Sequence, residues 1–359
     1  MTTQEQRVLA AVRATPTATQ QELAERIGMS REAIAGHIMR LTRKGYILGK
    51  GYIFPEADSI VVIGAANVDL SGNSQSAFLA GDSNPGSIHQ SIGGVGRNIA
   101  ENLARLGNDT TLVAAIGKDS SGQWLREQCI NAGINTDYFH VSDQHATGRY
   151  IALNNHLGEL QAALADMQVV DSLSPSYLQD QIKIVKAAQT LVLDANISSQ
   201  TLLWLAQQNL DASLMADAVS ANKAPKLKPI LSKLQVLKVN QSEAQAILES
   251  DESSVEVLAQ LLLKCGVKQV LLSLGNQGVL YCDAKQLFIS PVKASKPVSD
   301  TGAGDSLLAG FIHARKLKPA LDIQQQLSFA LHCAALTLES EFAVNPTLDE
   351  QAIMSQLSH

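Results

Sequence analysis

The sequence predicts a small N-terminal helical domain followed by a three-layer α/β domain. In the α/β domain a parallel sheet lies between two layers of helices and carries a small β lid. From residue 59 onward, short apolar runs such as SIVVIGAANVDL, TLVLDAN and KQVLLSLG alternate with helical stretches. This alternation is typical of a parallel sheet covered by helices on both faces. One later segment breaks the alternation, and the N-terminal residues follow another pattern. We therefore expect two domains, formed by residues 1–54 and 59–359.

The composition limits the classes of protein to consider. The chain has 359 residues, of which 45% are hydrophobic and 17% charged, enough for one large domain and one small one. No segment approaches the roughly 18 consecutive apolar residues of a membrane span, and the N-terminus lacks the basic-then-apolar order of a signal peptide. Four widely spaced cysteines argue against a disulfide framework and a zinc site. We expect a cytoplasmic protein that contacts no membrane.

Charge is divided unequally along the chain. Residues 1–50 contain eight Lys and Arg against four Asp and Glu, a balance of +4, which leaves −10 on the remaining 309 residues because the net charge is −6. A basic head is compatible with a nucleic acid backbone, whereas an acidic body makes general affinity for nucleic acid unfavourable. The two parts are therefore expected to have different partners.

Three helical stretches form the predicted head, namely Gln4–Arg13, Thr19–Ile27 and Ser30–Arg43. Thr19 and Ser30 are suitable N-caps, and Gly28-Met29 forms a short turn between the second and third helices. The run YILGKGYIF then alternates and is split by glycines, which predicts a two-stranded wing. The stretch resembles the winged helix-turn-helix heads of bacterial transcription regulators.

In that geometry the third helix enters the major groove of DNA. Its early, outward residues would meet base edges, and basic residues further along would meet phosphates. The predicted base contacts are Ser30, Arg31, Ala35 and His37, and the predicted phosphate contacts are Arg40, Arg43, Lys44 and Lys50. A small protein-interaction domain with solvated charges is the alternative.

Polar residues follow several of the predicted strands in the body. Ligands of parallel sheets bind beyond the carboxyl ends of the strands, so these residues mark a candidate site. They are Asn67 and Asp69 after one strand, and Asn196, Asn240 and Ser273 after three others. The segment TGRYIALNNHLGELQAALADM instead contains two alternating strands around a turn at 155–158 and no helix. A hairpin projecting from a parallel α/β body is typical of a lid over a pocket.

Two glycine-rich segments precede helices. The first is Gly93-Gly94-Val95-Gly96-Arg97-Asn98, where glycines let the backbone approach a ligand and Asn98 offers its amide to a hydroxyl group. A simple turn is the alternative interpretation of these glycines.

The second glycine-rich segment is Asp300-Thr301-Gly302-Ala303-Gly304-Asp305. Small residues expose backbone N–H groups to an anion, and the helix dipole adds positive potential where a transferring phosphoryl group accumulates charge. Asp305 is placed to accept the proton of an attacking hydroxyl group. A carboxylate that only stabilises its helix terminus is the alternative.

Two further motifs indicate a nucleotide site. In Asn240-Gln241-Ser242-Glu243, the Glu243 carboxylate is predicted to complete a capping box, to hold Mg²⁺ through water, or to do both. In LSLGNQGVL, Gly275 and Gly278 mark a tight connection that could admit the ribose and phosphates of a nucleotide.

Together, GGVGRN, the hairpin lid, NQSE, LSLGNQG and TGAGD resemble the ribokinase-like, PfkB-type carbohydrate kinases, in the correct order from Ser59 to the C-terminus. The resemblance implies phosphorylation of a sugar hydroxyl by MgATP, with Asp305 as base and the backbone of Gly302, Ala303 and Gly304 as anion hole. It implies that the sugar contacts Asn67, Asp69, Gly93, Gly94 and Asn98. It also implies that the nucleotide side is lined by Asn196, Asn240, Glu243, Ser273 and Gly275.

The sequence departs from the family pattern at two places. Ribokinase-like chains commonly have Asp-Thr-Thr before Gly-Ala-Gly-Asp, where this chain has Ser299-Asp300-Thr301, so the need for a monovalent cation stays open. In the late helix on the adenine side, this chain has His332, which either contacts adenine or has a structural role.

Within the family, GGVGRNIAENLARLG, TGRYIAL, ALADM and ADAVSANKAPKL are most similar to pseudouridine kinases. The resemblance implies that Thr147 and Asp166, at the ends of the lid strands, lie near the base of the substrate. We expect phosphorylation of a nucleoside at its 5′-hydroxyl by a homodimer. The alternatives are a kinase of another nucleoside or sugar, and a transcription regulator that uses the kinase fold as a ligand sensor.

Overall fold

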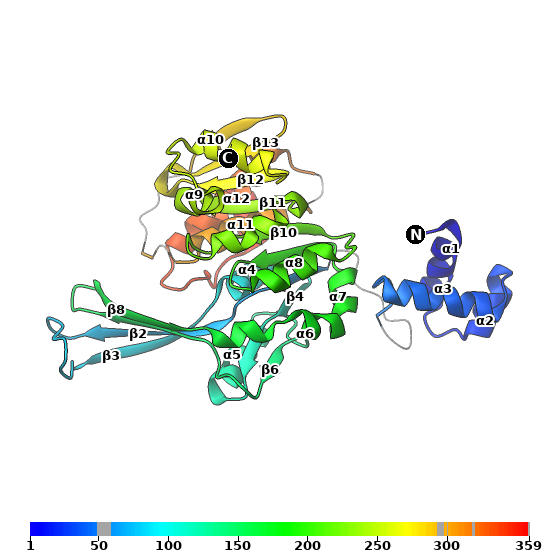
Figure 1. The fold of residues 1–359 in the computed structure, drawn as a ribbon, viewed down its shortest axis with the longest axis horizontal. Coiled ribbons are helices and arrows are strands. Elements are labelled where there is room, and N and C mark those ends of the chain that lie inside the picture. Colours follow the sequence, from blue (N-terminus) through cyan, green and yellow to red (C-terminus); the bar gives the residue numbers. More distant parts are fainter. Residues whose placement is uncertain (49–58, 293–297, 300, 318–319, 358–359) are drawn as a thin grey trace.

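The computed structural model describes residues 1–48, 59–292, 298–299, 301–317 and 320–357 (Figure 1). Residues 49–54 of the predicted wing, which include the predicted phosphate contact Lys50, the segment 55–58 between the two predicted domains, and Asp300 lie outside the described residues. The boundary between the two domains therefore stays a prediction. Among the described residues, no helix has the length and apolar character needed to cross a bilayer.

The head consists of α1 (Thr3–Ala14), α2 (Gln20–Ile27) and α3 (Arg31–Arg43). Thr19 and Ser30 cap α2 and α3 as predicted, since each side chain accepts a hydrogen bond from the backbone three residues on. Gly28 ends α2 in the left-handed conformation. The helices enclose a small apolar core whose fully buried members include Val8, Val12, Leu23, Ile34 and Leu41.

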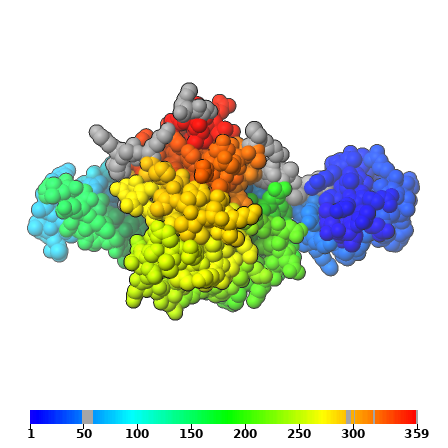
Figure 2. Space-filling model, turned by 90° about the horizontal axis from the view of Figure 1, so that it is seen from above, coloured from blue at the N-terminus to red at the C-terminus, as the bar shows by residue number. Residues whose placement is uncertain are grey.

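The head contacts the body just after α3. The Tyr46 hydroxyl donates a hydrogen bond of 2.6 Å to Asp211 Oδ2. Gly45 packs so closely on α7 (Ile182–Ala187) that a Cβ at this position would lie 2.7 Å from the Ala187 nitrogen. Figure 2 shows the head and the lid projecting from opposite sides of the body.

The body is built on an eight-stranded sheet in the order β14-β13-β12-β11-β10-β9-β1-β4. Its six strands from β4 to β12 are mutually parallel, as predicted, but β13 and β14 pair antiparallel at one edge. The strands are β1 (Ile60–Ile63), β4 (Thr110–Val113), β9 (Thr190–Asp194), β10 (Ser213–Asp217), β11 (Val236–Asn240), β12 (Gln269–Ser273), β13 (Val279–Asp283) and β14 (Leu287–Ser290).

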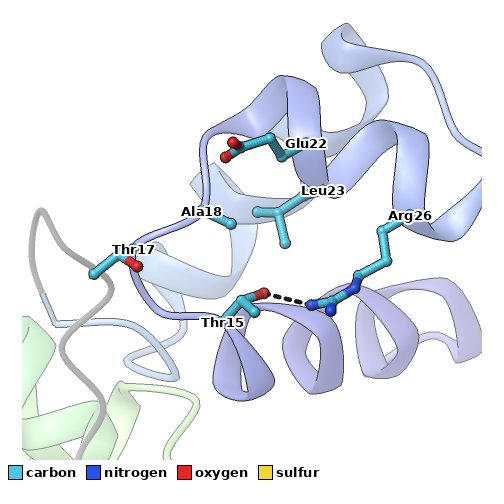
Figure 3. A pocket seen from close by; sticks show the side chains of 6 residues that line it. All are labelled: Thr15, Thr17, Ala18, Glu22, Leu23 and Arg26. Atoms are coloured by element: carbon cyan, nitrogen blue, oxygen red, sulfur yellow. Dashed lines mark hydrogen bonds between the residues drawn. The ribbon is translucent and has the colours of Figure 1, made fainter.

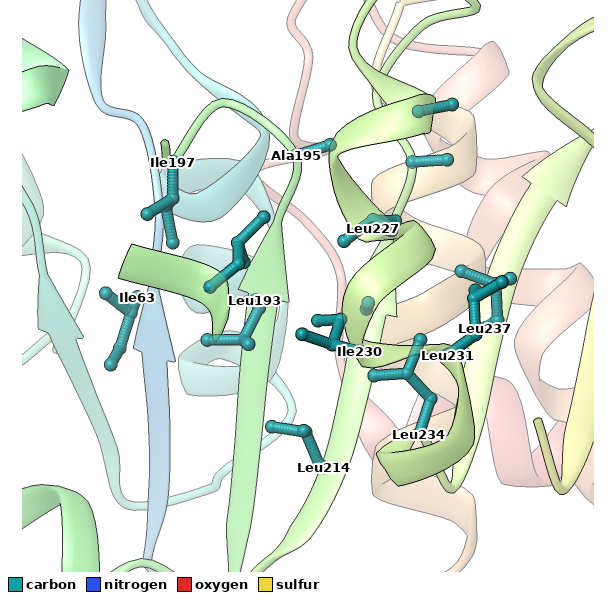
Figure 4. Close-up of a cluster of buried hydrophobic side chains, with 14 of the residues drawn as sticks. Ile63, Leu193, Ala195, Ile197, Leu214, Leu227, Ile230, Leu231, Leu234 and Leu237 are labelled. Atoms are coloured by element: carbon teal, nitrogen blue, oxygen red, sulfur yellow. The ribbon is translucent and has the colours of Figure 1, made fainter. Parts of the chain in front are cut away.

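Helices cover both faces of this sheet, because successive strand residues point to opposite sides. Leu191 and Leu193 of β9 enter one apolar cluster, and Val192 between them enters the other. Figure 4 shows part of the first cluster, with Ile63 of β1, Leu193 of β9, and Leu227 and Ile230 of η2 (Ala224–Lys233) among its side chains. This face is covered by α6 (Pro175–Asp180), α7, α8 (Ser199–Gln207), η2, α9 (Gln241–Leu248) and α10 (Val255–Lys264). The other face is covered by α4 (Val95–Arg105), α5 (Ser120–Asn131), α11 (Ala303–Ala314) and α12 (Ile323–Leu338).

The lid is larger than the predicted hairpin. The hairpin itself is present as β7 (Arg149–Asn154) and β8 (Leu160–Asp166), but β2 (Asn67–Ser74) and β3 (Gly86–Gly93) complete a four-stranded sheet in the order β3-β2-β7-β8. The apolar run that looked like a single strand, SIVVIGAANVDL, is divided between β1 in the body and β2 in the lid. The chain therefore passes from body to lid at residues 64–66. This segment lies next to the first glycine-rich segment, residues 93–96, which we call the glycine loop.

Shorter elements complete the fold. A two-stranded parallel sheet is formed by β5 (Ala115–Gly117) and β6 (His140–Ser142). The chain also contains η1 (Gln168–Ser172), η3 (Gly275–Gln277) and α13 (Glu350–Leu357). All four cysteines are free thiols, as predicted.

Candidate active site

The predicted anion hole lies at the start of α11. Gly302 is the N-cap residue and has a φ of 82°, a conformation that favours glycine. A Cβ at this position would also overlap the carbonyl oxygen of Ala343. The first amides of a helix have no acceptor within the helix, so the backbone here can bind an anion.

Asp305 is buried in the first turn of α11, 7% exposed. The side-chain amide of Asn98 donates a hydrogen bond of 2.7 Å to Asp305 Oδ2, which brings the two predicted motifs together. Burial raises the pKa of Asp305 to about 7, with a further contribution from the charge of Asp217. A carboxyl group with a pKa near neutrality is well suited to accept a proton at physiological pH.

Asn98 has an unused acceptor. Its Oδ1 atom is buried and has no hydrogen-bond partner among the described residues. Buried polar atoms are rarely left without a partner, so this atom indicates a place where a ligand hydroxyl group can donate.

The sugar side begins where β2 enters the lid. Asn67 Nδ2 donates a hydrogen bond of 2.5 Å to Asp69 Oδ1, and burial raises the pKa of Asp69. A Cβ at Gly93 would overlap the Asp69 carboxylate, and a Cβ at Gly94 would overlap the carbonyl of Ala65. The glycines are therefore required for the approach of the loop to Asp69 and β1.

Asp194, which was not predicted from the sequence, holds the glycine loop in place through backbone hydrogen bonds. It is fully buried at the end of β9, and its Oδ2 accepts from the backbone N–H groups of Ala65 at 2.9 Å and Gly96 at 2.8 Å. Its Oδ1 accepts from the backbone N–H of Asn196 at 2.9 Å. The structure thus places Asn196 beside the glycine loop.

A buried ion pair between Lys238 and Asp217 lies next to the predicted anion hole. Neither residue was predicted from the sequence to belong to the site. Lys238 Nζ is 3.1 Å from Asp217 Oδ2, and a Cβ at Gly304 would lie 2.5 Å from the same Nζ. Burial alone would lower the pKa of Lys238, but the charges of Asp217, Glu243 and Asp305 raise it. The ammonium group can therefore balance negative charge that accumulates at the anion hole. The signal in the sequence was a lysine within the apolar run LQVLKVN.

Glu243 completes the predicted capping box of α9. Its two oxygens accept hydrogen bonds from the backbone and side chain of Asn240, at 2.8 and 2.9 Å. Burial raises the pKa of Glu243, while the charge of Lys238 opposes this. No cluster of three potential metal ligands occurs within the described part of the chain. The Glu243 carboxylate is an oxygen ligand of the kind that Mg²⁺ contacts directly or through water.

An open groove of about 580 Å³ lies beside this capping box. Its lining brings together the predicted Asn240 and Ser273, and also Gln241, Ser242, Gln245, Val255, Leu274 and Gln277. Gly275, just after β12, is exposed. Gly278 is buried, has a φ of 105°, and lies so close to Pro291 that a side chain would not fit there. The Nδ1 atom of His332 lies 2.7 Å from the Ser328 carbonyl oxygen.

The two predicted residues at the ends of the lid strands have different surroundings. Thr147 is buried, donates a hydrogen bond of 2.6 Å to Asp119 and accepts one of 3.0 Å from the Gly117 backbone. Because its hydroxyl proton is donated within the protein and its side chain is buried, we assign Thr147 to the base of the lid rather than to the substrate. Asp166 is exposed and lies opposite Arg149 in the antiparallel register of β7 and β8.

On the head, the predicted DNA contacts also differ among themselves. Ser30, Arg31 and Arg43 are exposed, whereas His37 is 7% exposed and its Nδ1 lies 2.9 Å from Arg40. A buried ring cannot reach base edges without rearrangement, so we leave His37 out of the proposed interface. Lys44 and Arg40 both approach the buried Glu5 carboxylate, at 2.9 and 3.5 Å.

A separate groove on the head, of about 460 Å³, is formed by the connection between α1 and α2 and by α2 itself (Figure 3). Within it, Arg26 donates a hydrogen bond of 2.9 Å to the Thr15 hydroxyl. None of its lining residues belongs to α3. We therefore do not include it in the DNA interface.

The parallel sheet, the anion hole and the buried carboxylate together define the class of protein as a phosphotransferase acting on a hydroxyl group. The model of the pfkB family of carbohydrate kinases matches residues 57–350, and the chain belongs to this family. A winged helix-turn-helix DNA-binding model matches residues 1–47. The fold and family predicted from the motifs are thus confirmed.

Individual relatives agree with this assignment. The chain is 33% identical over 362 residues to YeiI, an uncharacterised sugar kinase of Escherichia coli strain K12, with 99% of each chain covered. It is also 33% identical over 305 residues to the pseudouridine kinase of that strain, covering 84% of this chain and 96% of the relative. The structure of Arabidopsis thaliana ribokinase complexed with ribose and ATP has the same fold, with a TM-score of 0.77, 23% identity, and 84% and 99% coverage. The protein is a sugar or nucleoside kinase.

Proposed function

We propose that the protein phosphorylates the 5′-hydroxyl of a nucleoside with ATP, and that the preferred substrate is pseudouridine. The observation that carries this proposal is the hydrogen bond between Asn98 and Asp305, because it joins the sugar side to the anion hole. The similarity to the Escherichia coli pseudouridine kinase over most of both chains supports the substrate. Because the donor is ATP, we place the reaction in the cytoplasm.

In the proposed reaction, Asp305 accepts the proton of the 5′-hydroxyl as the oxygen attacks the γ-phosphorus of ATP. The bond between that phosphorus and the β,γ-bridging oxygen breaks, so the products are the nucleoside 5′-phosphate and ADP, and the proton leaves Asp305 to solvent. The N–H groups at Gly302, Ala303 and Gly304 and the Lys238 ammonium stabilise charge on the transferring group.

The sugar is held by side chains around the glycine loop. The Asp69 carboxylate accepts from ribose hydroxyl groups, with Asn67 fixing its orientation, and Asn98 accepts through its free Oδ1. Gly93 and Gly94 let the backbone approach the sugar. We place the base beyond them, toward the exposed Asp166 at the end of β8.

The nucleotide occupies the groove beside α9. We propose contacts with Asn240, Ser273 and Gly275, with Gly278 shaping the turn and His332 on the adenine side. Glu243 would hold Mg²⁺ through water, and Mg²⁺ would neutralise the phosphates of ATP. Asn196 is proposed to contact the phosphates rather than the adenosine, because it lies beside the glycine loop.

A coupled assay of ADP release tests this function. Pseudouridine, uridine, ribose and fructose are compared at matched concentrations with the full-length protein. We expect the highest kcat/KM with pseudouridine. A higher value with a free sugar would replace the substrate, and no ADP release with any acceptor would favour a ligand-sensing regulator.

We also propose that the head binds DNA through the exposed face of α3, using Ser30, Arg31 and Arg43. Arg40 and Lys44 would approach phosphates from their positions beside Glu5. A drop in DNA retention as salt rises would support phosphate contacts, since released counterions make such binding salt-dependent. Retention that is independent of salt would favour a protein-interaction domain.

A homodimer through the lid is proposed as the assembly. Directly paired residues of neighbouring strands share a face, so Ile88, Leu153 and Leu164 fall on one side of the lid sheet with Gly72 and Ala162. These three large apolar side chains are exposed, at 77%, 39% and 66%. An exposed apolar face of this kind marks an interaction surface, and a monomer by analytical ultracentrifugation would contradict the proposal.

A further inference from the structure

Two lysines converge on Asn196 at the rim of the sheet. Lys223 Nζ donates to Asn196 Oδ1 at 2.5 Å, and Lys226 Nζ donates to the Asn196 carbonyl oxygen at 3.2 Å. Both lysines follow β10, at the beginning of η2, and both are half-buried. Their ammonium groups therefore approach the same residue from one side of the sheet edge.

The charge of this pair of lysines is only partly balanced by the protein. Among the described residues, neither ammonium group has a carboxylate oxygen within 4.0 Å, whereas the neighbouring Lys228 pairs with Glu249 at 2.5 Å. Burial lowers the pKa of Lys223, the charge of Asp194 raises it, and the nearby charge of Lys226 lowers it to a smaller extent. The Asp194 oxygens are occupied by the backbone N–H groups of the glycine loop and of Asn196.

Two half-buried cations near one carboxylate, that of Asp194, keep an excess positive charge, which favours binding of a further anion. The position of the pair indicates which anion this is. Asn196 is hydrogen-bonded to Asp194, and Asp194 to Gly96, so the lysines lie only two hydrogen-bonded residues from the glycine loop. That loop leads into Asn98, which contacts Asp305.

We propose that Lys223 and Lys226 form a subsite for the phosphoryl group in transit, binding the γ-phosphate of ATP before transfer and the 5′-phosphate of the product after it. This rests on the proposed function and assigns a specificity role to two residues outside the motifs of the glycine loops and capping box. Asn196 holds the two ammonium groups in place, and a phosphate oxygen completes their hydrogen bonds. The subsite distinguishes ATP from ADP, and a nucleoside 5′-phosphate from the free nucleoside.

The test measures equilibrium binding to the full-length protein by calorimetry. The variants are Lys223→Gln and Lys226→Gln, which keep a donor toward Asn196 but remove the charge. Lys228→Gln, from the same 3₁₀ helix, is the matched control because its partner is Glu249. The ligands are ATP, ADP, pseudouridine and pseudouridine 5′-phosphate, and thermal unfolding confirms that each variant is folded.

We expect Lys223→Gln and Lys226→Gln each to bind ATP and the nucleoside 5′-phosphate on the order of 10- to 100-fold more weakly, because each loses a charge-assisted hydrogen bond. Affinity for ADP and for the free nucleoside should stay within about twofold, and Lys228→Gln should change none of the four. Lys223→Arg should restore part of the preference for ATP over ADP.

Other outcomes would overturn the subsite. Equal weakening of ATP and ADP would place the lysines on the diphosphate, and equal weakening of the nucleoside and its 5′-phosphate would place them on uncharged groups of the acceptor. Unchanged affinities would leave them with a structural role only. The ATP and ADP measurements need no acceptor, so they remain decisive even if the protein phosphorylates another hydroxyl compound than pseudouridine.

Discussion

The head buries Glu5 and the body buries Asp305, and the pKa values of these two carboxyl groups are shifted in opposite directions. In the head, hydrogen bonds from Lys44 and the Thr2 backbone lower the pKa of Glu5 to about 2. In the body, burial and the charge of Asp217 raise the pKa of Asp305 to about 7. Glu5 is therefore a permanent charge that fixes α3 against α1, whereas Asp305 can exchange a proton near neutral pH.

The two regions also differ in the range of their contacts. The helix starts of the head depend on caps that join residues three apart, such as Thr19 and Glu22, and its longer contact between Lys44 and Glu5 spans 39 residues. The site in the body joins Asn98 to Asp305, 207 residues apart, and Gly96 to Asp194, 98 residues apart. Local sequence rules thus describe the head, and the topology of the sheet assembles the site.

The largest expected effect is that of Asp305→Asn. We expect kcat for ADP release to fall on the order of 10²- to 10⁴-fold, because the proton acceptor is lost. Glu5→Gln, the matched change in the head, should leave kcat unaltered. An Asp305→Asn variant that is folded and retains activity within about threefold of the parent would remove Asp305 from the role of base.

Asp69→Ala should have the next largest effect, and on the acceptor alone. We expect KM for the nucleoside to rise on the order of 10- to 100-fold, because hydroxyl groups lose a charged acceptor, while KM for ATP stays constant. Initial rates at varied concentrations of each substrate give both values. An unchanged nucleoside KM would move the sugar site elsewhere.

Two variants around the base should shift the pH dependence in opposite directions. The Asp217 charge raises the pKa of Asp305 and the Lys238 charge lowers it. Because the carboxylate is the active form, activity rises with pH through this pKa. Asp217→Asn should move the midpoint to lower pH and Lys238→Gln to higher pH, each by about one unit. Profiles of kcat from pH 5 to 9 would show this, and shifts of the same sign in both variants would contradict it.

Removal of residues 1–54 should have the smallest effect on catalysis. We expect kcat and both KM values within about twofold of the full chain, because the proposed catalytic residues lie beyond Ser59 and the contacts of Gly45 and Tyr46 with the body do not involve them. DNA retention should be lost. An insoluble or inactive body would show that the head has an integral structural role.

The sequence predicted the parts of the site that lie in short motifs. Asp305, Asn98 and the glycines lie at helix starts, because the positive φ and the close backbone contacts at Gly94 and Gly302 require glycine. It did not predict Asp194, Asp217 or Lys238, because polar residues in buried strands look like strand ends or exceptions until the neighbouring strands are known.

The lid and the head show the same limit. The strand β2 was hidden in an apolar run that continues from β1, and only the pairing with β3 and β7 separates them. The burial of His37 depends on how α3 packs in the head, and the engagement of Thr147 depends on Asp119, 28 residues away. Spacing along the chain does not determine such contacts.

The most direct test of the account is the pH profile of ADP release by residues 59–359 alone, measured beside the full-length protein with pseudouridine as acceptor. We predict that both proteins give the same plateau, with activity falling about tenfold per pH unit below a midpoint near 7, the pKa of Asp305. A body that is folded but inactive, or a profile without a midpoint near neutral pH, would contradict the claim that this region is a self-sufficient kinase with Asp305 as its base.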